Sequence, residues 1–408
     1  MKKIFFIILW IALLVLGLIG VRERLLFEHR LANYGSYVPW GLGVAAYIYF
    51  IGLSAGAFLL SSLIYVFGVK KLEAIGKTAL FTALITLVMA LVCIWLDIGH
   101  MERAWRVLLT PNFTSMMAWM IWLYTAYFIL LIFETYFVMR NDFIQLSKST
   151  PPGFLKSLYQ LLALGSLVSS EESVRRNERI VKVLAIIGLP LAIAFHGGVG
   201  ALFAVVGAKP FWHTSLMPIL FLTGALTSGG ALLTAVIAFL WKKYAGQKDL
   251  VVLLGKIILG LLCFDLLLEL VEITIPLWGN MEYHTQSLKL VLFGEYWYVF
   301  WIFHILLGSA IPLILLTVKN KSTSAIGIGS FLVASTFLAM RLNIVIPAQV
   351  VPELKGLESA YIEPHLMFSY LPSFHEWRLV FFILALGIAL FYLGWKILPL
   401  APKPAISR

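Results

Sequence analysis

Charged residues are scarce in this sequence: they occupy 12% of its 408 positions, whereas 61% of the positions are hydrophobic. Soluble globular domains carry about 25% charged residues, so the composition excludes a soluble protein and indicates a polytopic, all-α integral membrane protein. No segment is polar and long enough to form an additional soluble domain. Chemistry on a water-soluble substrate would therefore need another subunit.

Cysteine is almost absent as well. The two cysteines, Cys93 and Cys263, lie in different apolar runs and form no CxxC pair. Two isolated thiols cannot hold an iron–sulfur cluster in this chain, because such a cluster needs four ligands. We interpret both as small apolar packing residues.

The hydrophobic residues gather in about ten runs, each long enough to cross a bilayer, which takes about 20 residues. We expect membrane spans at roughly 4–21, 38–69, 78–98, 115–139, 180–206, 214–241, 250–276, 294–318, 325–347 and 376–399. No small-x-small cleavage site follows the first run, so we interpret it as a span and not as a signal peptide. The segment 154–162, after two prolines, suits a helix lying in the membrane interface.

The positions of the basic residues predict the orientation. Most of the 31 Lys and Arg residues fall on the face that carries the N-terminus. By the positive-inside rule this face is cytoplasmic, and ten spans place both termini there. The basic residues near the two ends of the sequence support this orientation. They are Lys2, Lys3, Lys396, Lys403 and Arg408. The formal net charge of +11 therefore indicates topology and not nucleic-acid binding.

An internal repeat is suggested by two stretches rich in small residues, at 53–62 and 226–235. Gly56 and Gly229 occupy equivalent positions, and both stretches run in the same direction across the membrane. We therefore expect two parallel-repeat four-helix bundles, spans two to five and six to nine, with spans one and ten peripheral. Chance is the alternative, because small residues are common in membrane helices.

This repeat divides the chain into four parts: 1–36, 37–206, 207–350 and 351–408. The first part holds the first span and a loop. The second and third parts hold the two bundles, and the fourth part holds a loop and the last span.

The richest ionisable cluster, 97–106, stands at the end of the third span. Asp97 and His100 are three residues apart and share a face if the helix continues that far. A half-buried carboxylate and an imidazole can exchange the protons that accompany two-electron quinone chemistry. Arg103 and its charged neighbours Glu102 and Arg106 either belong to the same site or form an interfacial charge cluster that only sets the membrane topology.

Several aromatic and polar residues near the same membrane face are suited to surround a flat ring. They are Tyr47 in the second span and Asn112, Trp119 and Tyr124 at or in the fourth. Each alone is more typical of packing or of an interfacial aromatic belt. Together they predict a pocket for a head group.

A second acidic group lies within the seventh span. Asp265, Glu269 and Glu272 are spaced to share one helix face. Buried carboxylates need partners or protons, so we expect Arg341 of the ninth span to pair with Glu269 or Glu272. The group is either a proton relay or a purely structural pair. Glu134 has two possible roles: it extends a hydrated proton path further into the membrane, or its side chain only snorkels to the membrane surface.

Two histidines, His196 and His304, lie at matched depths in the fifth and eighth spans. Two such imidazoles could ligate a b-type haem, but the repeat places them in different bundles. We favour a cavity-lining role for His196 beside the proposed ring pocket.

Three of these segments together resemble the NrfD/polysulfide-reductase membrane-anchor family. They are 53–57 in the second span, 97–100 after the third and 111–119 before the fourth. The ten spans and the segment 370–377 are most similar to the branch that includes the membrane subunit of hydrogenase-2.

The resemblance implies a fold without haem, iron–sulfur cluster or metal that binds menaquinone or ubiquinone near the periplasmic face of the first bundle. It also implies a periplasmic ferredoxin-like iron–sulfur partner serving a molybdopterin, hydrogenase or multihaem catalytic subunit. Carried onto this chain, the acid next to the quinone is Asp97, with His100 near it. Some members have His in place of Asp97 and an acid in place of Met120.

These observations predict a quinone- or quinol-reactive membrane anchor of a respiratory oxidoreductase in the cytoplasmic membrane of a bacterium or archaeon. Two alternatives remain. An ion-coupled secondary transporter would use the buried acids and Arg341, and a cytochrome b would use His196 and His304.

Overall fold

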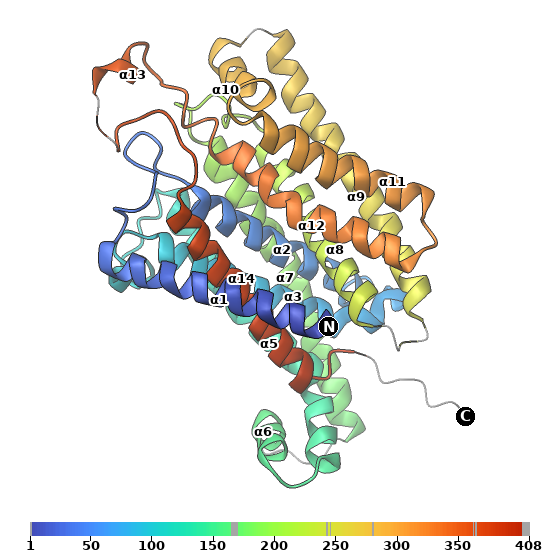
Figure 1. The fold of residues 1–408 in the computed structure, drawn as a ribbon. Helices are drawn as coiled ribbons and strands as arrows, with labels where there is room; N and C mark the ends of the chain where they lie inside the picture. The colour runs from blue at the N-terminus through green and yellow to red at the C-terminus, as the bar shows by residue number, and fades with distance from the viewer. Residues whose placement is uncertain are drawn as a thin grey trace.

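The computed structural model describes residues 2–164, 170–241, 244, 246–279, 281–361, 363 and 365–401. Within these residues every regular element is a helix (Figure 1). Lys403 and Arg408, which support the predicted orientation, lie outside the described residues.

Ten helices in the described chain are long and apolar enough to cross a membrane, as predicted. They are α1 (Lys2–Phe27), α2 (Leu42–Tyr65), α3 (Gly76–Asp97), α5 (Met116–Ser149), α7 (Glu171–Ala204), α8 (Met217–Leu240), α9 (Gln247–Trp278), the continuous η3 (Val299–Ala310) and α11 (Ile311–Val318), α12 (Thr323–Val345) and α14 (Phe374–Ile397). The chain is therefore a multi-pass integral membrane protein.

Short helices occupy the connections between the spans. They are η1 (Lys70–Ile75), η2 (Met101–Arg103), α4 (Arg106–Leu109), α6 (Phe154–Leu162), α10 (Glu282–Leu292) and α13 (Leu357–Ala360). Helix α6 lies at the end opposite to α10 and α13 (Figure 1). It exposes Phe154 and Leu161, which fits the predicted interfacial helix.

Helices α2 and α8 form the centre of the molecule. Helix α2 packs against α3, α7, α8 and α12, while α8 also packs against α9. Nearly all residues of α2 are buried, whereas α5, α7 and α9 expose apolar side chains on their outer faces. The division into two bundles related by a parallel repeat stays a prediction.

Glycines bring the backbones of α2 and α8 into contact. A Cβ atom on Gly229 would lie 2.6 Å from the carbonyl oxygen of Leu53, and one on Gly56 would collide with the carbonyl oxygen of Ala225. The two stretches that suggested the repeat therefore pack against each other. Close approach of this kind is how small residues drive helix association in lipid, where no hydrophobic force acts between helices.

Helix η3 has π geometry over twelve residues, Val299–Ala310. The hydroxyl of Ser309 donates to the carbonyl of His304, five residues earlier, at 3.0 Å. Pro312 follows and has no N–H to continue a regular α-helical ladder. Such π segments are often found at functional positions.

The first and last spans pack together as an antiparallel pair on α3 (Figure 1). A Cβ atom on Gly17 of α1 would lie 2.5 Å from the Cα atom of Phe382. Glu23 of α1 also bonds to His375 at 3.0 Å and to Arg378, both in α14. The start of α1 and the end of α14 therefore lie at the same end of the molecule; we call this end face A and the opposite end face B.

We expect Gly56→Ala to lower the stability of the purified protein by about 1–3 kcal/mol, because the added methyl group forces α2 and α8 apart. Thermal unfolding in detergent checks this. The matched control is Gly260→Ala, because a Cβ atom on Gly260 of α9 would meet nothing within 4 Å. Equal stability of the two variants would contradict the close α2–α8 contact.

Candidate functional site

Asp97 is the last residue of α3, and its side chain points inward, toward α2. A Cβ atom on Gly43 of α2 would collide with the Asp97 carboxylate, so only glycine leaves it room. The carboxylate adjoins a hollow of about 20 Å³, also lined by Tyr34, Cys93 and Glu376. Such a hollow holds a water molecule but no aromatic ring. A ring near Asp97 must therefore approach from outside this hollow.

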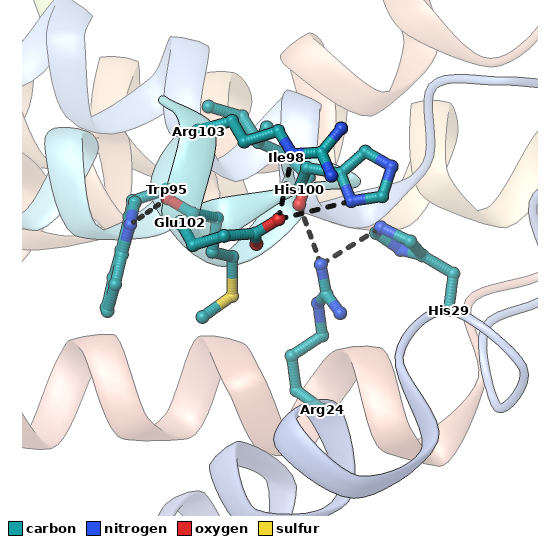
Figure 2. Close-up of polar contacts among 8 residues, drawn as sticks. Arg24, His29, Trp95, Ile98, His100, Glu102 and Arg103 are labelled. Carbon is teal, nitrogen blue, oxygen red and sulfur yellow. Dashed lines mark hydrogen bonds and ion pairs between the residues drawn. The ribbon is translucent and has the colours of Figure 1, made fainter. Parts of the chain in front are cut away.

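The helix does not continue as far as His100: α3 ends at Asp97 and the chain turns away, so Asp97 and His100 do not share a helix face. His100 and Arg103 lie in the exposed loop, where both approach the Glu102 carboxylate, at 3.4 and 3.3 Å (Figure 2). Their side chains are more than half exposed, so these pairs contribute little to stability.

The end of α3 is capped by Arg24, a buried arginine of α1 (Figure 2). Its guanidinium donates to the carbonyls of Leu96 and Ile98, both at 2.7 Å. These oxygens belong to the end of the helix, where carbonyls lack intrahelical partners and the dipole favours a cation. Arg24 therefore fixes the position of Asp97. We did not predict this role from the sequence, where Arg24 is one of several charged residues after the first span.

His29 and Tyr34 extend the cap on the same face. His29 contacts the Arg24 guanidinium at 3.0 Å, and its other ring nitrogen bonds to the Tyr34 hydroxyl. Burial, together with the charge of Arg24, lowers the pKa of His29 below its ordinary value of 6.5. Burial, reinforced by the Asp97 carboxylate, raises the pKa of the Tyr34 phenol. We expect a neutral imidazole and a neutral phenol beside the acid at neutral pH.

Glu376 is a second acid at this position that the sequence analysis missed. Its side chain is 4% exposed and lines the same hollow as Asp97. It accepts hydrogen bonds from the Tyr370 hydroxyl and from the backbone N–H groups of Asn33 and Ser373, the latter two at 3.1 and 2.9 Å. With Ser373 it forms a capping box that begins α14. The pattern Ser-x-x-Glu before an apolar run was the available signal.

Tyr370 links this acid to the start of α2. Its hydroxyl accepts a hydrogen bond from the backbone N–H of Leu42 at 2.6 Å and donates to Glu376. Burial and the neighbouring carboxylate raise the pKa of Tyr370. Asp97 and Glu376 thus belong to one polar cluster formed by the ends of α1, α2, α3 and α14.

Only two of the four predicted aromatic and polar pocket residues come together. Tyr47 and Tyr124 meet edge to face at 6.0 Å between ring centroids. Asn112 lies in the exposed loop, where its side chain accepts hydrogen bonds from Thr114. Trp119 is half exposed on the outside of α5, and its indole N–H donates to the Phe113 carbonyl at 2.8 Å.

The three acids of α9 each have a neighbour from another helix. Asp265 accepts a hydrogen bond from Thr223 at 2.9 Å. Glu269 bonds to His304 of η3 at 2.7 Å. The nearest polar contacts of Glu272 are Thr214 at 3.4 Å and His284 at 3.9 Å. Glu269, Glu272 and His304 line a hollow of about 70 Å³.

The expected ion pair of Arg341 is wrong: no carboxylate of the described residues lies within 4.0 Å of its guanidinium. Its side chain instead lies over the rings of Phe221 and Phe337, at 4.5 and 5.1 Å from the centroids, and approaches the Phe221 carbonyl at 3.5 Å. Gly224 of α8 leaves space for the guanidinium, since a Cβ atom there would lie 3.0 Å from its Nη2 atom, and Gly52 of α2 lies nearby. The arginine therefore points toward α2 and α8 and not toward α9.

The two candidate haem ligands have different surroundings. His196 is fully buried near Phe221 and Gly52, and within the described chain neither ring nitrogen has a partner. His304 bonds to Glu269 on the other side of α8. Phe221 lies beside His196, at 6.2 Å between ring centroids, whereas Phe300 lies beside His304, at 5.8 Å.

Glu134 of α5 is fully buried, and neither carboxylate oxygen has a hydrogen-bond partner among the described residues. It therefore does not snorkel to the surface, which was one of its two expected roles.

The fold and these acids define a multi-pass membrane protein with titratable groups clustered at one end of its spanning helices. The chain belongs to the NrfD family: the family model "Polysulphide reductase, NrfD" matches residues 31–353. The resemblance found in the sequence is thereby confirmed.

Three relatives cover almost the whole chain. A selenate reductase subunit of Mesobacillus selenatarsenatis is 35% identical over 408 residues, which is 99% of this chain and 95% of that protein. The Hdr-like menaquinol oxidoreductase integral membrane subunit of Archaeoglobus fulgidus is 29% identical, covering 93% and 90%. The menaquinone reductase integral membrane subunit of Nitratidesulfovibrio vulgaris is 25% identical, covering 90% and 85%.

We expect Arg24→Met to loosen the end of α3, because two helix-end carbonyls lose a charged donor worth about 1.5–3 kcal/mol. Limited proteolysis of the loop at 98–115 in detergent should become at least several-fold faster. Arg22→Met is the matched control, since Arg22 is exposed on the same helix. Unchanged proteolysis in Arg24→Met would contradict the cap.

The lowered pKa of His29 predicts that the cap weakens in acid. In the opened state, the His29 imidazole takes up a proton below about pH 6.5, whereas in the folded cap it resists protonation. The cap therefore loses stability as the pH falls through this range. Proteolysis of the wild-type loop should accelerate between pH 7.5 and 5.5. His29→Gln should flatten this dependence, whereas the exposed His365→Gln should retain it.

Proposed function

We propose that this chain is the quinone-reactive membrane subunit of an oxidoreductase, exchanging electrons between a membrane quinone and an iron–sulfur partner. The main support is the set of full-length relatives: two are named as integral membrane subunits of a menaquinol oxidoreductase and of a menaquinone reductase. The selenate reductase relative is likewise one subunit of a larger enzyme. Membership of the NrfD family agrees with this role.

The proposed ring site lies beside Asp97, where the end of α3 meets the neighbouring surface of α5. Asp97 holds or releases a proton at its carboxylate, and Tyr47 and Tyr124 supply an aromatic wall one to two turns deeper. The hollow on the other side of Asp97 admits a water molecule. Through it, Glu376 and Tyr370 offer a second acid and a hydroxyl for proton exchange with face B.

The remaining predicted residues form the surroundings of this site in the proposal. His100, Arg103 and Asn112 stand in the loop at its mouth, with Trp119 on the adjoining surface of α5. His196 lies deeper, on α7. Asp265, Glu269, Glu272, Glu134 and Arg341 remain a proposed proton relay, in which Arg341 acts by its charge and not through an ion pair.

Face B is the proposed docking side for the electron-transfer partner, because Asp97 lies at that boundary. The partner is a ferredoxin-like iron–sulfur subunit that serves a molybdopterin, hydrogenase or multihaem catalytic subunit. The positive-inside pattern makes face B periplasmic and places both termini in the cytoplasm. The membrane is then the cytoplasmic membrane of a bacterium or archaeon, and the quinone is menaquinone or ubiquinone.

We expect Asp97→Asn to lower quinone-linked turnover of the assembled complex at least about 100-fold, because the amide cannot carry the proton. Activity of the same complex with an artificial dye, which bypasses the quinone, should persist. Asp249→Asn, at an exposed acid in the first turn of α9, is the matched control and should retain both activities. Full quinone turnover in Asp97→Asn would refute the site.

A further inference from the structure

A crevice of about 570 Å³ lies between η3, α12 and the segment that precedes α14. Its size is in the range of small-molecule sites. Two of its lining residues, Phe303 and Ser335, are exposed on the outer surface of the helices, so the crevice opens toward lipid. Its lining residues include none from α2, α3 or α5, and it adjoins the polar cluster around Asp97 and Glu376 through Tyr370.

Asn343, in the last turn of α12, is the unsatisfied polar group of this crevice. It is 8% exposed, and within the described chain neither its amide nitrogen nor its oxygen has a hydrogen-bond partner. A buried amide without partners costs about 1–3 kcal/mol, which a ligand bonded to it would offset. The two hydroxyls that α12 contributes to the lining of the crevice differ from this amide: Thr336 and Ser335 donate to the carbonyls of Leu332 and Phe331 of their own helix, both at 2.8 Å.

The lining of the crevice selects a neutral ligand. No Lys, Arg, Asp or Glu is among its described lining residues, so nothing attracts a phosphate group. Tyr298 and Trp377 supply aromatic surface near face B, and Phe303 and Leu307 continue along η3 into the membrane. This arrangement suits a flat polar ring with a hydrocarbon tail. An amide donates to a ring carbonyl and accepts from a ring hydroxyl, so it suits the oxidised and the reduced ring alike.

Asn343 also lines the smaller hollow that contains Glu269, Glu272 and His304. The amide therefore stands between the crevice and the acids of α9. A ring oxygen bonded to Asn343 would lie next to the proposed proton relay.

We propose that this crevice is a second binding site for a prenylated quinone or quinol, with a ring oxygen on Asn343 and the tail along η3. The choice of ligand class rests on the proposed function, but the geometry does not involve Asp97.

Photolabelling tests the proposal. The purified complex in phosphatidylcholine nanodiscs is irradiated with an azidobenzoquinone carrying a decyl tail, and labelled peptides are mapped by mass spectrometry. We expect label in Val299–Ala310 and Thr323–Val345, with competition by short-chain menaquinone. Asn343→Leu should reduce this label about tenfold, the effect of one lost hydrogen bond of about 1.4 kcal/mol.

Three comparisons make the result decisive. Thr336→Val keeps the label, because its hydroxyl serves its own helix. Asp97→Asn also keeps it, so failure of the Asp97 site and failure of the crevice are distinguishable. Ala339→Phe, which fills the crevice, should abolish the label while the variant retains the size-exclusion profile of the wild type. Unchanged labelling in Asn343→Leu and Ala339→Phe, or displacement by phospholipid and not by menaquinone, overturns the proposal.

Discussion

The capped end of α3 is the constraint on which the candidate site depends. Arg24 reaches across from α1 to the carbonyls of Leu96 and Ile98, so the helix stops at a fixed residue and Asp97 faces inward. Gly43 gives the carboxylate its space. Without this cap, Asp97 would be free to turn outward with His100 into the exposed loop, where an acid has no reason to differ from other surface acids.

Close packing at glycines also occurs deeper in the protein. Glycines on α2 and α8 bring two backbones together, and Gly224 of α8 also leaves room for the guanidinium of Arg341. In lipid, unpaired polar groups are costly, so each must be matched by backbone, aromatic face or ligand. Arg341 uses a carbonyl and two rings, whereas the side chains of Asn343 and Glu134 have no hydrogen-bond partner within the described residues.

Apolar run length predicted the ten spans well, because a bilayer imposes one thickness on every crossing. Helix periodicity also placed Asp265, Glu269 and Glu272 on one face. The errors came from contacts between distant segments. The end of the third span was predicted within one residue of Asp97, the observed end of α3, but nothing in the local pattern indicates which way Arg341 points. The partnership of Asp97 with Glu376 joins residues on the third and last spans, which no spacing rule can reveal.

The pairing of α1 with α14 has a consequence for biogenesis. Glu23 finds its partners, His375 and Arg378, on the helix that is synthesised last. Glu23 therefore lacks both partners until α14 has been synthesised and has packed against α1. A chain without α14 would leave this carboxylate without either partner.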